Sequence, residues 1–141
     1  MIDKEIIKIA SNTENHGKLD NHTHFSKLKN SICGDDMKIY LIIDEDRIAN
    51  LKYECESCVY CQASVSLLSK NAKNQSVEKF KNFAQQANNS FENNTNSFDK
   101  DWKEFGKIMN KKNISRKECL LLPLNTTLDA LNKKSSLTSK K

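Results

Sequence analysis

The sequence predicts an α+β protein in which a small antiparallel three-stranded sheet packs against several helices. Runs rich in β-branched and aromatic residues lie between Phe25 and Glu54, and most of the helical periodicity follows Ser57. Strands that precede the helices, rather than alternate with them, are typical of this fold class. The 141 residues suffice for one hydrophobic core. We expect a single domain over residues 1–134 and a flexible tail over residues 135–141.

The chain is predicted to open with a short amphipathic helix, followed by a loop. Apolar side chains recur there at helical spacing, at Ile2, Ile6 and Ile9. Residues 12–21 are polar and contain Gly17, which favours a loop.

The predicted sheet consists of an edge strand and a hairpin. Residues 25–32 form the short edge strand. Residues 38–43 are β-branched and aromatic, and residues 48–54 alternate well enough to be the return strand. The acidic residues 44–46 between them make the turn.

Three apolar stripes at helical spacing follow Ser57, which is the expected N-cap of the first of these segments. They comprise Ala63, Leu67 and Leu68, then Val77, Phe80, Ala84 and Ala87, and then Phe98, Trp102, Phe105 and Met109. The Asn-rich residues 90–97 are predicted as a loop. We interpret the aromatic stripe as core packing and not as a cofactor site.

A last helix is predicted from the leucines at 121, 124, 128 and 131. Proline is tolerated in the first turn of a helix and disfavoured further in. Because of Pro123, this helix is expected to begin at Leu121 or Leu122.

The overall charge argues against a nucleic-acid partner. The net charge is +5, and several of the excess lysines lie near the C-terminal end. A nucleic-acid binder clusters its positive charge with aromatic residues or within a known module, and the sequence shows neither. We therefore expect this charge to serve solubility.

The sequence favours a cytoplasmic protein with reduced thiols. It contains no apolar run of the roughly 18 residues that a membrane span requires. Its first residues include Asp3 and Glu5 and lack the apolar core of a signal peptide. Five cysteines is an odd number, which argues against a disulfide framework. Metal binding or thiol chemistry is the better expectation.

Three thiols and a carboxylate form a candidate metal site. Gly34 allows the chain to turn, so that Cys33 and Asp35 face one point just before a strand. Cys58 lies at a predicted helix start, where the helix dipole favours a thiolate. Cys119 is expected to be exposed in the loop before the last helix, close to basic side chains. Three thiolates and one carboxylate suit tetrahedral zinc.

A competing interpretation uses the C-x-x-C-x-x-C spacing of Cys55, Cys58 and Cys61, which occurs in ferredoxins. The further nearby cysteine of a ferredoxin is missing, and Cys55 falls on a predicted strand whereas Cys61 falls within a helix. The simpler interpretation makes Cys55 and Cys61 half-buried packing residues. The three histidines, at 16, 22 and 24, are interpreted as solvent-exposed.

Four segments resemble the NifU-like iron–sulfur cluster assembly scaffold family, which includes the IscU and SufU proteins. Residues 12–19 are similar to the family's N-P-R-N-x-G-x-L loop. Residues 33–38 contain its C-G-D motif, and residues 57–66 are similar to its G-C-x-x-x-x-A-S-x-S motif. Residues 116–119 match the segment of its third cysteine. The downstream A-S-x-S pattern makes Cys58 the family cysteine.

The chain departs from the family pattern at four positions, and its spacing is closest to the SufU-type branch. Thr13 and Glu14 replace Pro and Arg, and Ser57 replaces Gly. Cys58 and Cys119 are separated by 61 positions, which resembles the SufU-type insertion. The L-P-P-V-K motif of the IscU branch is missing. Glu118 stands where IscU-type proteins carry His and SufU-type proteins usually carry Lys.

The resemblance implies a zinc-binding sulfur acceptor that works with a SufS- or NifS-like cysteine desulfurase. Cys33, Asp35, Cys58 and Cys119 are the implied ligands, and Cys119 is our choice as acceptor of the desulfurase's persulfide sulfur. Apo iron–sulfur proteins would be the final clients, with neither nucleic acid nor membrane involved. An alternative is a scaffold that binds iron and assembles a transient [2Fe–2S] cluster on the same ligands. A third hypothesis is a structural zinc protein that only binds partners.

Overall fold

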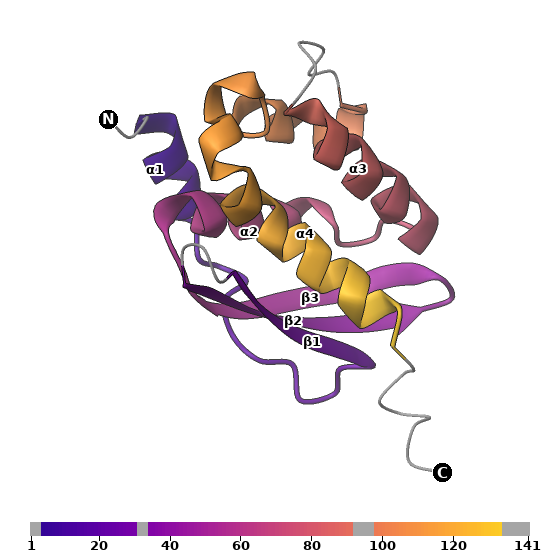
Figure 1. Ribbon diagram of the computed structural model, residues 1–141. Helices are drawn as coiled ribbons and strands as arrows, with labels where there is room; N and C mark the ends of the chain where they lie inside the picture. Colours follow the sequence, from indigo (N-terminus) through magenta and orange to yellow (C-terminus); the bar gives the residue numbers. More distant parts are fainter. Residues whose placement is uncertain (1–3, 31–33, 92–97, 134–141) are drawn as a thin grey trace.

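The computed structural model describes residues 4–30, 34–91 and 98–133 and confirms the α+β class. A three-stranded antiparallel sheet forms one layer, and the helices gather on one of its faces (Figure 1). In chain order the elements are α1 (Lys4–Ala10), β1 (His24–Asn30), β2 (Asp35–Asp44), β3 (Arg47–Glu56), α2 (Val59–Asn71), α3 (Val77–Ser90), the 3₁₀ segments η1 (Lys100–Lys107) and η2 (Lys111–Arg116), and α4 (Lys117–Leu131).

The sheet has the predicted hairpin, with β2 in the centre between β1 and β3. Glu45 and Asp46 form a tight turn with φ values of 50° and 63°, the left-handed conformation that two-residue hairpin loops require. Strand β2 begins at Asp35, three residues before the predicted start at Lys38. Asp35 pairs with Asn30 of β1, so this carboxylate belongs to the strand and not to a preceding loop.

The inward face of the sheet forms the floor of the core. Met37, Ile39 and Leu41 alternate along β2, and each is fully buried. Helix α4 packs across β1 and β2, and α2 lies beside α4 and α1. Helix α4 crosses over the sheet in Figure 1, so these buried side chains of β2 lie between the sheet and the helices.

The last helix begins at Lys117, four or five residues before the predicted start at Leu121 or Leu122, so the sequence-based boundary was wrong. Pro123 lies inside α4 and lacks the N–H that would bond the carbonyl of Cys119. Burial outweighs this penalty, because most of the helix from Cys119 to Leu124 is packed in the core. The consequence for the site is that Cys119 belongs to the first turn of α4.

The aromatic stripe after residue 97 packs in the core, as predicted, but Trp102 and Phe105 lie in a 3₁₀ segment, and Phe98 and Met109 lie outside it. Trp102 stacks on Phe83 of α3 with ring centroids 4.3 Å apart and an angle of 5° between the ring planes. The ring centroid of Phe105 lies 4.7 Å from that of Phe83. These contacts fasten η1 to α3 and bury the stripe.

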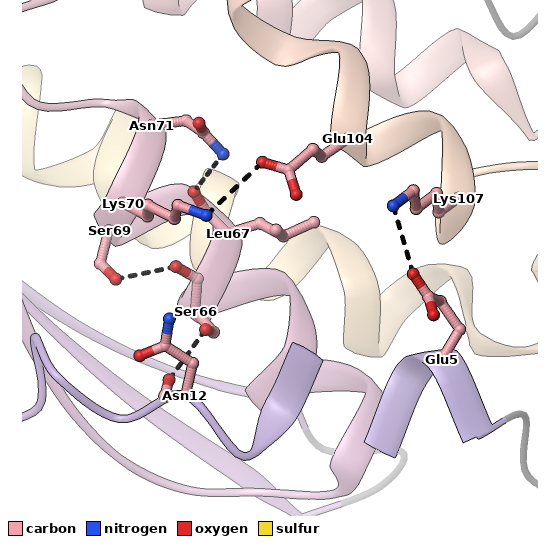
Figure 2. Close-up of polar contacts among 9 residues, drawn as sticks. All are labelled: Glu5, Asn12, Ser66, Leu67, Ser69, Lys70, Asn71, Glu104 and Lys107. Carbon is pink, nitrogen blue, oxygen red and sulfur yellow. Dashed lines mark hydrogen bonds and ion pairs between the residues drawn. The ribbon is translucent and has the colours of Figure 1, made fainter. Parts of the chain in front are cut away.

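Polar contacts connect α1, α2 and η1 at the surface (Figure 2). Lys107 of η1 pairs with Glu5 of α1 at 3.2 Å, and Lys70 of α2 pairs with Glu104 of η1 at 3.9 Å. Exposed ion pairs of this kind stabilise a fold little. We therefore expect the aromatic packing against α3 to hold η1 in place more strongly than these ion pairs do. Among the described residues, no helix is both long and apolar enough to cross a bilayer.

Candidate metal centre

Asp35, Cys58 and Cys119 meet at the end of the sheet nearest the start of α2. One ligand atom from each lies within 4.8 Å of the other two. The three residues come from the start of β2, the residue before α2 and the first turn of α4. Segments far apart in the sequence thus place two thiols and a carboxylate together, and these are three of the four residues in the predicted ligand set.

Asp35 is the central polar group of this cluster. The residue is only 2% exposed, and its Oδ1 accepts a hydrogen bond of 2.9 Å from the backbone N–H of Cys58. The N-cap of α2 is Cys58, one residue after the predicted Ser57. The side chain of Cys58 makes no capping hydrogen bond. The Asp35 carboxylate satisfies an N–H at this helix terminus, where negative charge is favoured.

The separation between Asp35 and Cys58 is suitable for a shared metal ion. The Sγ of Cys58 lies 3.7 Å from Oδ2 of Asp35. Two ligands bound tetrahedrally to zinc at usual Zn–S and Zn–O lengths would be about 3.6 Å apart. Thiolate and carboxylate ligands also suit iron, so the donor set fits either metal.

Cys119 is buried, contrary to the expectation of an exposed loop thiol. Its exposed fraction is 1%, because the first turn of α4 packs against the core. The hydroxyl of Ser64 in α2 donates a 2.6 Å hydrogen bond to the carbonyl of Leu120. Arg116 lies over the ring of Tyr60, with its guanidinium carbon 5.1 Å from the ring centroid. These contacts hold the segment of Cys119 against the start of α2.

Asn30 is a site residue that sequence reasoning missed. Its side-chain Nδ2 donates to the Sγ of Cys119 at 3.8 Å. The available signal was a polar side chain at an inward-facing strand position, since Ser26, Leu28 and Asn30 alternate on one face of β1. The predicted fourth ligand, Cys33, lies outside the described residues.

The two further thiols, Cys55 and Cys61, do not join this cluster. Cys55 lies on β3 and is half-buried, whereas Cys61 lies in α2 and is fully buried. Burial raises the pKa of both thiols. Within the described residues, the group able to hold a metal comprises Asp35, Cys58 and Cys119 and excludes the C-x-x-C-x-x-C set.

Substitution of Cys55 or Cys61 by Ser is therefore expected to leave metal content and sulfur acceptance nearly unchanged. Serine keeps the size of each side chain, and neither sulfur is placed to contact a metal held by Asp35. Elemental analysis of the two purified variants tests this. Loss of the metal from either single variant would restore the C-x-x-C-x-x-C interpretation.

The histidines differ in their surroundings. His16 is exposed, as expected, but His22 and His24 are half-buried, so the interpretation of all three as solvent-exposed was wrong. His22 Nδ1 lies 2.6 Å from the carbonyl of Leu19, and burial lowers the pKa of His24. The described cluster of Asp35, Cys58 and Cys119 contains no histidine.

The fold and the site together define a small α+β domain with a candidate thiol–carboxylate metal site. The sequence-family model of the NifU-like N-terminal domain matches residues 1–98. This chain belongs to the NifU-like N-terminal domain family, which confirms the resemblance seen in the motifs. Cys119 lies beyond the matched range, so its place in the site rests on the structure.

Two similar proteins are named as iron–sulfur cluster assembly scaffolds, one as an IscU protein and one as a protein of the SUF system. The chain is 29% identical over 140 residues to the iron–sulfur cluster assembly scaffold protein IscU of Thermotoga maritima, with 94% of each chain covered. A candidate cluster assembly scaffold for the SUF system from Fervidobacterium islandicum has a TM-score of 0.81 and 25% identity, covering 93% of this chain and 96% of that one. The N-terminal NifU-like protein of Brucella abortus has the same fold, with a TM-score of 0.85 at 18% identity and coverage of 92% and 90%.

Proposed function

We propose that this protein is a cytoplasmic iron–sulfur cluster assembly protein that accepts sulfur from a cysteine desulfurase at a zinc-binding site. Cys33, Asp35, Cys58 and Cys119 would hold the zinc ion, which would keep the thiols ionised when bound. The observation that supports this most is the meeting of Asp35, Cys58 and Cys119 in a chain of the NifU-like family.

In this proposal, Cys119 is the sulfur acceptor. Its thiolate attacks the outer sulfur of the desulfurase's cysteine persulfide, and a new S–S bond forms on Cys119. The original S–S bond of the desulfurase breaks, and its electron pair leaves on the desulfurase cysteine as a thiolate. A two-electron reductant, such as a pair of thiols, would release this sulfur as sulfide, and apo iron–sulfur proteins would finally receive it in assembled clusters.

The burial of Cys119 adds a requirement to this scheme. A sulfur that is 1% exposed is not open to attack on a persulfide carried by another protein. Docking of the desulfurase must therefore open the contact between the first turn of α4 and its neighbours. The exposed Arg116 and the half-buried Tyr60 make one contact between the segments of Cys119 and Cys58 that docking could open.

A second candidate function is a scaffold for a transient [2Fe–2S] cluster. The names of the IscU and SUF-system relatives favour it, and the same thiolates and carboxylate would bind the cluster as cargo. Reconstitution with iron and sulfide, followed by transfer to an apo-ferredoxin, separates the two. Stimulation of a desulfurase by a colourless zinc protein supports sulfur acceptance. A brown protein that passes its cluster on supports the scaffold.

The Asp35→Ala variant is expected to retain metal or cluster for longer but to turn over sulfur more slowly. A carboxylate is the weakest ligand of the set and the one that yields its place most easily. Asp36→Ala is the matched control, because Asp36 is the next residue of β2 and forms a surface ion pair with Lys29 at 3.8 Å. Desulfurase turnover with each variant tests this expectation. A faster Asp35→Ala protein would contradict the role of Asp35 as the labile ligand.

A further inference from the structure

Asn30 occupies an unusual place for an amide side chain. It is the last residue of β1, it faces the core together with Ser26 and Leu28, and it is 9% exposed. Burying an amide costs free energy unless its polar atoms find partners. An apolar residue would suit this position better if packing were the only requirement.

The contacts of Asn30 lead to two segments of the candidate metal centre. Its Nδ2 donates to the Sγ of Cys119 at 3.8 Å. Its main-chain carbonyl accepts a 2.7 Å hydrogen bond from the N–H of Gly34, which has a φ of 72°. In the strand register it also lies directly opposite Asp35. One residue therefore touches the turn before Asp35 and the sulfur of Cys119.

The side chain and the main chain of Asn30 do different things. The hydrogen bond to Gly34 uses the main chain, so it survives a change of side chain. The amide N–H is the part directed at sulfur, and such a donor interacts more strongly with a thiolate than with a neutral thiol. It restrains the sulfur's position and withdraws electron density from it. Hydrogen-bond partners of metal ligands influence both the affinity of a site for its metal and the electronic structure of the bound metal.

We propose that Asn30 is a positioning residue of the metal centre. Its amide holds the Cys119 sulfur toward Asp35 and Cys58 and weakens the electron donation of that sulfur to a bound metal. This inference rests on the proposed function, because it requires that the site binds a metal ion.

The test measures metal binding by an Asn30→Leu variant, which keeps the side-chain volume and removes the donor. Zinc affinity, measured by competition with a chromophoric chelator, is expected to fall roughly 10–100-fold, because the loss of positioning outweighs the stronger electron donation of the freed sulfur. With cobalt in place of zinc, the sulfur-to-metal charge-transfer band is expected at longer wavelength, because an unbonded thiolate gives up an electron more easily. A purely structural role for Asn30 would not shift this band.

Two further variants keep the result interpretable. Asn113→Leu removes another buried amide, which donates to the carbonyl of Ile108 at 2.8 Å, and should leave zinc affinity and the cobalt band unchanged. Asn30→Ala gives the same two measurements if the leucine variant does not fold. Wild-type affinity and an unshifted band in the Asn30 variants would overturn the role of Asn30 while leaving the proposed function intact. Absence of metal binding by the wild-type protein would overturn both.

Discussion

The Cys119→Ser protein is expected to lose sulfur acceptance. A serine hydroxyl stays protonated at neutral pH and is a far weaker nucleophile than a thiolate, so it cannot take sulfur from a persulfide. Stimulation of a cysteine desulfurase should fall to the rate of the desulfurase alone. Mass spectrometry should find no added sulfur on the variant.

Cys61→Ser is the matched control for Cys119→Ser. Both cysteines are buried in helices of the same core, but only Cys119 lies beside Asp35 and Cys58. The control should stimulate the desulfurase like the wild-type protein. Full stimulation by Cys119→Ser would contradict its role as acceptor and direct attention to Cys58, the half-buried thiol of the site.

Double replacement, Cys58→Ser with Cys119→Ser, is expected to remove the metal. Each neutral hydroxyl is a poor substitute for a thiolate, and the double replacement leaves Asp35, the weakest of the three ligands, as the only charged ligand of the described cluster. The metal content should fall below about a tenth of the wild-type value. The folded state should survive without metal, because the packing of the large hydrophobic core, which includes Trp102 and Phe83, does not require a bound ion. Circular dichroism of the variant checks that it remains folded.

Much of the fold was predictable because periodicity reports burial directly. The hairpin around Glu45 and Asp46 and the core role of Trp102 follow from local patterns that the structure confirms. The start of α4 was not predictable, because the local rule against interior proline at Pro123 is outweighed by tertiary packing. The same packing buries Cys119 in a helical turn where a loop was expected.

The candidate ligand residues could be predicted from the sequence, but the hydrogen bonds that position them could not. Asp35, Cys58 and Cys119 stand in motifs that identify them one by one, and the structure brings them together. The contact from Asn30 to Cys119 joins residues on separate elements, and no local pattern specifies that pairing. The hydrogen bond from the Cys58 N–H to Asp35 is also tertiary, and it explains why α2 begins without a side-chain cap of its own.

The most direct test of the account is elemental analysis of the aerobically purified wild-type protein beside the Cys58→Ser, Cys119→Ser variant. We predict one zinc ion per wild-type chain, no colour, and a variant that is folded but nearly free of metal. Stoichiometric zinc in the folded double variant would contradict a metal centre built on Asp35, Cys58 and Cys119.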